Sequence, residues 1–203
     1  MKKFLKIALI LALIILLVAG GYFIAINLTK KQALESIDKM FTAIKTGDKE
    51  QIKQYINIDD SEEETETNEE NTDKNEEMEK IMLKKLNYEV VSTDAKLNEC
   101  TVKLNVSNKD LKTVFQNYIT KAFSLAFSQA FSGTTEEEMD NQLNQYLEEQ
   151  YNSDSIQTIT SEVTINMKKE KGKWNVNCDE NEIVNAVLPG YKEVVEAMNN
   201  VEE

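Results

Sequence analysis

The sequence predicts an α+β protein in which an N-terminal transmembrane helix precedes an α+β roll, a curved antiparallel sheet packed on helices. Three observations predict it: an uncharged apolar run near the N-terminus, two regions of alternating apolar residues, and helical apolar spacing around those regions. Two hairpins that each have one apolar face need helices to cover that face, and this is the layer arrangement of an α+β domain.

We expect six segments along the 203 residues. They are a cytoplasmic N-terminus at 1–6, a transmembrane helix at 7–26, a helical region at 27–58 that opens the outer domain, an acidic disordered loop at 59–79, the remainder of the roll at 80–190, and a C-terminal helical tail at 191–203.

The apolar run from Ile7 to Ile26 has no charged residue. Its 20 residues span about 30 Å as a helix, the hydrocarbon thickness of a bilayer. The tripeptide 18–20 is typical of a lipoprotein signal, but Gly21 follows it and has no thiol to carry a lipid. A secretory signal has an apolar core of about 7–15 residues, so the longer run favours an uncleaved anchor. A cleaved signal and a buried soluble helix are the alternatives.

Charges near the run predict its orientation in a membrane. Lys2, Lys3 and Lys6 favour an N-terminus inside the cell and a domain outside, whereas Lys30 and Lys31 oppose this orientation. A long following domain translocates largely regardless of such charges. We therefore expect a single-pass cell-membrane protein with its domain outside.

The overall charge excludes some functions. The formal net charge is −13, and every basic side chain is Lys, because the sequence contains neither Arg nor His. Nucleic acid is excluded as a partner, since phosphate binding needs clustered cations. Residues 59–79 contain 12 acids and one Lys, which predicts a solvated, self-repelling loop. A site for a cation or a basic partner is the alternative.

Helical spacing begins again at Thr29. Leu34, Ile37, Phe41 and Ile44 share one face. Nothing between Ile26 and Leu34 breaks a helix, so this helix is predicted to continue from the membrane segment. We expect Gly47 to end it and Asp48 to cap a short second helix.

Alternating apolar residues predict two hairpins. A first hairpin centred near Lys96 would pair Leu86 with Val106, Tyr88 with Leu104, and Val90 with Val102. A second hairpin with a two-residue turn at Lys171-Gly172 would pair Lys169 with Trp174, Met167 with Val176, and Ile165 with Cys178.

Two long helices are predicted between the hairpins. The first runs from Asp110 to about Phe131, and its apolar stripe winds around the helix, so its two ends should bury different sides or the helix should bend. Its phenylalanines are interpreted as core residues, with a ligand cavity as the alternative. Thr135 and Glu138 fit a capping box for the second helix.

The last hairpin carries a family resemblance. A charged turn with Gly172, then Trp174-x-Val176, then a helix that Asp179 caps and that ends at Pro189-Gly190, resembles the final hairpin of nuclear transport factor 2-like (cystatin-like) domains. It resembles in particular the membrane-anchored or lipid-anchored members of unknown function from Gram-positive bacteria. The segment 43–56 also resembles the start of such domains. The resemblance implies a sheet curled around a long helix with a cone-shaped pocket, in a fold that hosts enzymes and non-enzymes.

The candidate pocket-lining residues are Tyr88, Tyr118, Phe123, Phe127 and Trp174. Cys100 and Cys178 are a candidate disulfide if the two hairpins are neighbours, and two small buried side chains otherwise. No residue pattern indicates a catalytic, cofactor-binding or metal-binding site, and no cofactor is expected.

These observations predict a membrane-tethered extracytoplasmic domain that is not an enzyme. It would bind a small apolar ligand or an envelope protein. The alternatives are a small pocket enzyme that uses a carboxylate or Tyr as acid and base, and a purely structural envelope or immunity-type protein.

Overall fold

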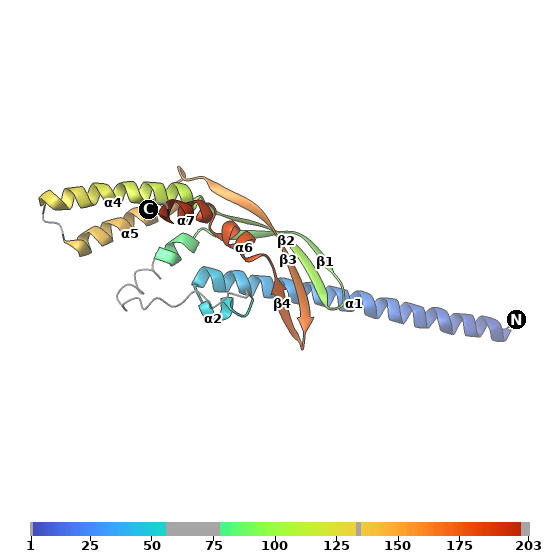
Figure 1. Cartoon of the computed structure of the whole chain (residues 1–203). Helices are drawn as coiled ribbons and strands as arrows, with labels where there is room; N and C mark the ends of the chain where they lie inside the picture. Colours follow the sequence, from blue (N-terminus) through green and yellow to red (C-terminus); the bar gives the residue numbers. More distant parts are fainter. Residues whose placement is uncertain (1, 56–77, 133–134, 200–203) are drawn as a thin grey trace.

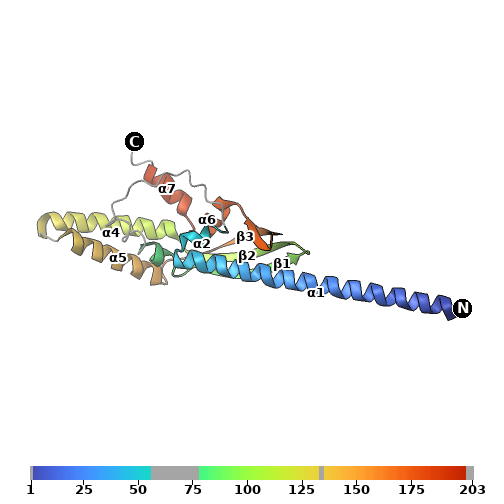
Figure 2. The same ribbon diagram turned by 90° about the horizontal axis from the view of Figure 1, so that it is seen from below.

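The structure, a computed structural model, describes the backbone of residues 2–55, 78–132 and 135–199, and the side chains of these ranges except 2–13 and 130–132. It is an α+β fold with a long apolar N-terminal helix and a four-stranded antiparallel sheet packed on helices. The long helix and a pair of further helices extend from opposite ends of the sheet (Figures 1 and 2). The predicted fold class is therefore confirmed at the level of α+β.

A single helix, α1, runs from Lys2 to Thr46. It confirms that the apolar segment and the first helix of the domain are continuous. Gly47, with φ of 67°, ends it: its N–H donates to the Ile44 carbonyl and the Asp48 N–H donates to the Ala43 carbonyl, the pairing of a glycine C-terminal cap. The Asp48 side chain then caps α2, Lys49–Ile52, as predicted.

Part of α1 is long and apolar enough to cross a membrane. Large apolar side chains of this part project into the surroundings with 67–69% of their surface exposed: Ile15, Leu16, Leu17, Val18, Phe23 and Ile24. The described domain does not bury this part of α1, which argues against the alternative of a buried soluble helix. A signal sequence passes the same test of length and composition.

The sheet has the order β1-β2-β3-β4, with β1 at Asn87–Ala95, β2 at Glu99–Lys109, β3 at Thr158–Glu170 and β4 at Lys173–Asn177. Two of the three pairs predicted for the second hairpin are confirmed, because Lys169 pairs with Trp174 and Met167 with Val176. The third, Ile165 with Cys178, is not part of the ladder, since β4 ends at Asn177. The turn residues of this hairpin, Lys171 and Gly172, have φ of 50° and 84°, as a two-residue hairpin turn requires.

The register predicted for the first hairpin is wrong. Tyr88 pairs with Val106 and Val90 with Leu104, and the register then shifts, so that Thr93 pairs with Val102. The hairpin tip lies at Leu97-Asn98, later than the expected centre at Lys96, since the Lys96 N–H donates to the Glu99 carbonyl. A bulge at Val91 adds a further residue to β1, and alternation alone does not reveal a bulge.

The main core lies between the second half of α1, the sheet and α6, Glu180–Val187. Each of these elements contributes side chains with at most 1% of their surface exposed: Ile37, Met40, Phe41, Val102, Leu104, Val106, Val163, Ile165, Ile183 and Ala186. Asn108 is also fully buried. Its Nδ2 donates to the carbonyls of Met82 and Val187 at 3.0 and 2.8 Å, so it ties β2 to a short helix at 78–83 and to α6.

The helix at 78–83 is a departure from the sequence prediction, which placed 78 and 79 in the acidic loop and gave no helix before the first hairpin. Met78, Ile81 and Met82 pack on a second cluster formed by Val114 and the end of the second long helix. The rest of the predicted loop, 59–77, lies outside the described residues.

The two long helices are α4, Leu111–Ser132, and α5, Glu136–Asn152. They lie side by side and extend from the sheet on the side opposite the N-terminus, as Figures 1 and 2 show. We call this pair the arm. The capping box of Thr135 and Glu138 is confirmed at the start of α5.

The interpretation of the α4 phenylalanines as core residues is wrong for Phe123 and Phe127, which are 73% and 72% exposed. The polar helix α5 buries Leu143, Leu147 and Tyr151, a narrow face that covers one side of α4. Among the described helices, none covers the other side of the outer half of α4, where Phe123 and Phe127 are exposed. The sequence predicts that the two ends of α4 bury different sides. Instead, side chains at the base of α4 are buried and those of its outer half are mostly exposed.

After α6, Pro189 and Gly190 separate it from α7, Tyr191–Asn199, as predicted. Gly190 has φ of 89°, and a Cβ there would lie 2.8 Å from Lys112 Cβ and 2.9 Å from the Lys112 backbone nitrogen. This glycine lets the α6–α7 connection lie directly against the base of the arm.

We expect Gly190→Ala to lower the free energy of unfolding by about 2–5 kcal/mol, because left-handed backbone strain of about 1–2 kcal/mol adds to overpacking of about 1–3 kcal/mol. Gly172→Ala is the matched control, with φ of 84° but no atom within 4 Å of the new Cβ, and should cost only the strain. Urea unfolding of the full chain in detergent, followed by the fluorescence of its single Trp, measures both. Equal losses in the two variants would show that the close approach to Lys112 is unimportant.

Candidate functional site

The five candidate pocket-lining residues do not come together in one pocket. Tyr88 packs against α1, Tyr118 joins the cluster at the base of the arm, and Trp174 is in the main core. Phe123 and Phe127 are on the exposed part of α4. The cone-shaped pocket lined by these residues is therefore not formed.

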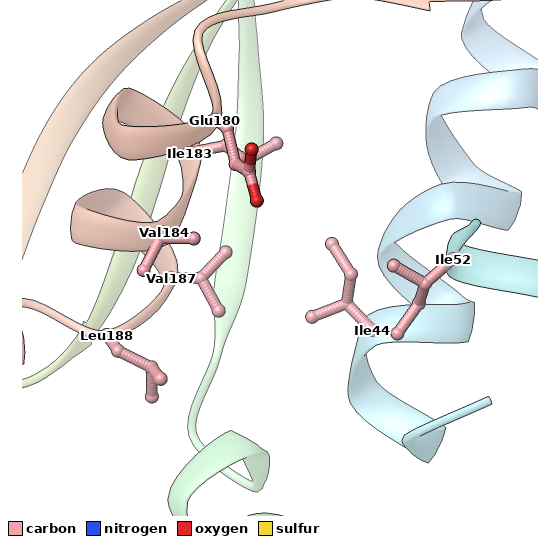
Figure 3. Close-up of a pocket in the computed structure, with 7 residues that line it drawn as sticks. All are labelled: Ile44, Ile52, Glu180, Ile183, Val184, Val187 and Leu188. Atoms are coloured by element: carbon pink, nitrogen blue, oxygen red, sulfur yellow. The ribbon is translucent and has the colours of Figure 1, made fainter. Parts of the chain in front are cut away.

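An apolar cavity of about 180 Å³ lies between α1, α2 and α6. Figure 3 shows Ile44 and Ile52 facing Ile183, Val184 and Val187 across it. Leu188 and Glu180 complete its lining. Sites for drug-sized ligands measure about 300–1,000 Å³, so this cavity is small for such a ligand.

Trp174 borders an open groove of about 440 Å³ between α1 and the β3–β4 hairpin. Its other lining residues are Ser36, Gln54, Tyr55, Gly172, Lys173 and Asn175. Small-molecule sites are mostly apolar and concave, whereas this groove is lined largely by polar side chains. The Trp174 ring itself is 9% exposed and lies 5.9 Å from Lys169 Nζ, so it is mainly a core residue.

Tyr88 is held in place by a ring contact and by a hydrogen bond. Its ring stacks on Phe41 with centroids 4.3 Å apart, and its hydroxyl donates to Asp38 Oδ1 at 2.8 Å. Burial, and then the hydrogen bond to Asp38 and its negative charge, raise the pKa of Tyr88 to about 12. A phenol with this pKa keeps its proton at neutral pH.

Other pKa shifts in the described part of the chain also lead away from neutral pH. Burial raises the pKa of Tyr118 and Tyr151, with smaller contributions from Asp140 and Asp110. A hydrogen bond from Lys84 lowers the pKa of Glu148. A general acid or base works best with a pKa near the operating pH, and none of these shifts produces one. In the same described ranges, no three His, Cys, Asp or Glu side chains are grouped as metal ligands.

The two cysteines are free thiols. Cys100 on β2 pairs with Met167 on β3, and Cys178 follows β4 on the other side of β3. Two strand spacings amount to about 10 Å, beyond the roughly 7 Å between Cα atoms that a disulfide spans. The hairpins are neighbours, as the candidate disulfide required, but β3 separates the two thiols. Burial is the main cause that raises the pKa of both thiols.

The exposed face of α4 is the surface that the sequence interpretation missed. Phe123 and Ala126 are exposed, and Phe115, Ile119 and Ala122 are half-buried beside them. Together with the exposed Phe127 they form an apolar stripe on the side of α4 away from α5; we call it the arm face. A sequence signal was present, because α4 has no acidic residue among its 22 in a chain of net charge −13.

The two helices of the arm differ in charge. The charged residues of α4 are Lys112 and Lys121. The charged residues of α5 are all acidic: Glu136, Glu137, Glu138, Asp140, Glu148 and Glu149. One side of the arm is thus apolar and weakly basic, and the other side is strongly acidic. Contiguous exposed apolar surface of this kind marks interaction sites in soluble domains.

Comparison with protein-family models, with curated proteins and with solved structures gave no match.

The Tyr88–Asp38 contact has a consequence at alkaline pH. The folded-state pKa of about 12 exceeds the ordinary value of about 10, so the stabilisation that this contact provides is complete below about pH 10 and is lost as the pH rises toward 12. We expect absorbance at 295 nm after rapid pH jumps to show late phenol ionisation, and Tyr88→Phe should lower its amplitude near pH 12 by one tyrosine.

Asp38→Asn separates the causes of this shift. It removes the charge but keeps an oxygen acceptor, so the late ionisation should move to lower pH without reaching the ordinary value, because burial is the largest cause. A late ionisation that is unchanged in both variants would mean that it belongs to another tyrosine.

Proposed function

We propose that this chain is a membrane-tethered, extracytoplasmic interaction domain that presents its arm to a partner protein of the cell envelope. The observation that carries the proposal is the exposed arm face, with Phe123 at 73% exposure, at the end of the molecule opposite the N-terminal apolar helix (Figure 1). The proposed role is binding and not catalysis.

The tether rests on α1. Its exposed apolar part needs an apolar environment. The described domain does not provide one, since only 6% of the apolar stretch of α1 is buried. A bilayer provides one over about 30 Å. Lys2, Lys3 and Lys6 favour an N-terminus inside and a domain outside.

The arm face fits a protein groove better than a bilayer. Recognition of a helix by a groove uses apolar side chains at successive turns, and Ile119, Phe123 and Phe127 are spaced in this way. Burying one such aromatic side chain contributes roughly 1.5–3 kcal/mol. The arm extends away from the segment that would enter the membrane (Figure 2), so the bilayer that holds α1 is not within reach of the arm face.

The charges of the arm define the chemistry of the partner. A groove that receives α4 places its edge beside α5, where six carboxylates are located. A partner with an apolar groove and a basic edge is complementary to this surface. A second copy of this chain is less complementary, because its own arm has the same acidic α5.

The other functions proposed from the sequence have less support. For a small apolar ligand, the apolar cavity of about 180 Å³ is small and the groove beside Trp174 is lined largely by polar side chains. For an enzyme, no group in the described residues has a pKa shifted toward neutrality. Membership of the nuclear transport factor 2-like family stays a prediction: the β3–β4 hairpin agrees with it, whereas the exposed arm between β2 and β3 is a departure.

For the tether, we expect the chain to stay with bacterial membranes during extraction at high pH and to keep its full mass. Protease added to intact protoplasts should remove the domain. Release of a protein that begins at Tyr22 would contradict the anchor, and full protection from the protease would contradict the orientation.

For the arm, we expect photo-crosslinking in the intact cells that encode this chain to trap a partner protein when Phe123 is replaced by p-benzoylphenylalanine. The new side chain is also aromatic, so it should preserve the contact. The same replacement at Gln142, an exposed position on α5, is the matched control and should trap much less of the same protein.

The supporting result is one discrete protein adduct that weakens at least several-fold when Glu137→Lys and Glu149→Lys are added, because these substitutions remove the charge complementarity. An adduct of twice the mass of the chain would show that the occupant is a second copy. An adduct with lipid, or a protein adduct that ignores the charge reversal, would contradict the proposed partner.

A further inference from the structure

Three segments that are far apart in the sequence lie together at the end of the sheet nearest the apolar helix: one turn of α1 and the two hairpin ends beside it. They are 29–32 of α1, the β1–β2 tip at 95–99, and the β3–β4 hairpin end at 168–173; we call them the lysine rim. Figures 1 and 2 both show the two hairpin ends beside α1 on the side of the N-terminus, and the arm on the other side.

Hydrogen bonds fix this arrangement. Thr29 Oγ1 donates to the Leu97 carbonyl at 2.8 Å, which joins the first hairpin to α1. Lys169 Nζ donates to Gln32 Oε1 at 2.6 Å, and the Lys169 N–H donates to the Asn98 carbonyl at 2.8 Å. Both hairpin ends are therefore held at the part of α1 that lies about one to two helical turns after Ile26, the last residue of the uncharged run.

The rim is basic in an acidic protein. Its three segments contain seven lysines and two acids, Glu99 and Glu170, so their net charge is +5, whereas that of the chain is −13. The lysines are Lys30, Lys31, Lys96, Lys168, Lys169, Lys171 and Lys173. Asp94 and Glu35, which flank these segments, reduce the excess to +3.

Most of this charge is accessible. All seven lysines except the half-buried Lys169 are exposed. Lys96 and Lys168 make ion pairs with Glu99 and Glu170 at 4.0 and 3.2 Å; both pairs are exposed and contribute little. Within the described residues, Lys30, Lys171 and Lys173 make no ion pair. Leu97, at the tip between the lysines, is 49% exposed.

We propose that the lysine rim binds the anionic phospholipid headgroups of the bilayer that α1 crosses, on the side where the domain lies. The inference rests on the proposed tether, because α1 brings the rim to the headgroup region. Exposed lysines beside a membrane are attracted to anionic lipids within about a Debye length, and Leu97 inserts at the boundary of the acyl chains. The rim thereby orients the domain, so that the arm is held away from the surface.

The experiment uses the full chain in nanodiscs of phosphatidylcholine alone or of phosphatidylcholine with phosphatidylglycerol. Trp174 is the only Trp of the chain and adjoins Lys173, so its quenching by a headgroup spin-labelled lipid reports how close the rim is to the bilayer. We expect quenching to be at least twofold stronger with phosphatidylglycerol, and the excess to disappear in high salt.

Lys171→Glu with Lys173→Glu should abolish the excess quenching. Lys45→Glu with Lys49→Glu reverses the same number of charges where α1 ends and α2 begins, far from the rim, and should keep the excess. Both lysines are exposed. Quenching that is equal in both lipids, or equal loss in the two double variants, would overturn the lysine rim.

Flotation of the same nanodiscs tests the tether separately. A chain that floats with the lipid in every variant but shows no charge-dependent quenching keeps its tether and has no lipid-binding rim. A chain that does not float in either lipid overturns the proposed tether itself.

Discussion

The uninterrupted helix α1 is the constraint on which the rest of the structure depends. One rigid element carries the exposed apolar segment and, without a linker, one wall of the core through Ile37, Met40 and Phe41. A flexible connection would leave the domain free to rotate relative to the apolar segment. Because α1 is continuous, the orientation of the domain is fixed relative to the helix axis. Each surface of the domain therefore lies at a fixed distance along that axis from the apolar segment.

The hairpin ends make this connection more rigid. Without the hydrogen bonds of Thr29 and Gln32, the helix would emerge from the core at about Ala33 as an isolated rod. Thr29 is a polar residue with only 6% of its surface exposed, and its hydroxyl satisfies a hairpin-tip carbonyl. This contact extends the packed length of α1 to the edge of the apolar segment, so the sheet and the helix move as one body.

Local chemistry was predictable from the sequence, and long-range placement was not. The caps at Asp48, Thr135 and Asp179 and the turn at Lys171-Gly172 depend on residues within a few positions of each other. The bulge at Val91 depends on which residues β2 presents, and alternation is equally good in either register.

The arm shows why the candidate site was misplaced. An apolar stripe that winds around α4 predicts burial on several sides, but the sequence does not state how many neighbours a helix has. Phe115, near the base, is half-buried, whereas Phe123, two turns further along the same stripe, is exposed. The same residue type in the same pattern thus has two environments. The difference arises because the sheet ends near the base of α4, and the sequence does not show where it ends.

The distribution of charge follows from this geometry. Carboxylates are repelled least by an anionic surface when they lie far from it. The acidic residues of α5 are at the end of the molecule away from the apolar helix. The lysines of the hairpin ends are at the near end. On the proposed tether, a charge gradient of this kind along α1 favours an upright domain over one that lies on the bilayer, because tilting would bring carboxylates toward anionic headgroups and move lysines away from them. The total of −13 therefore says less about the partners of this protein than the separation of its charges along one helix.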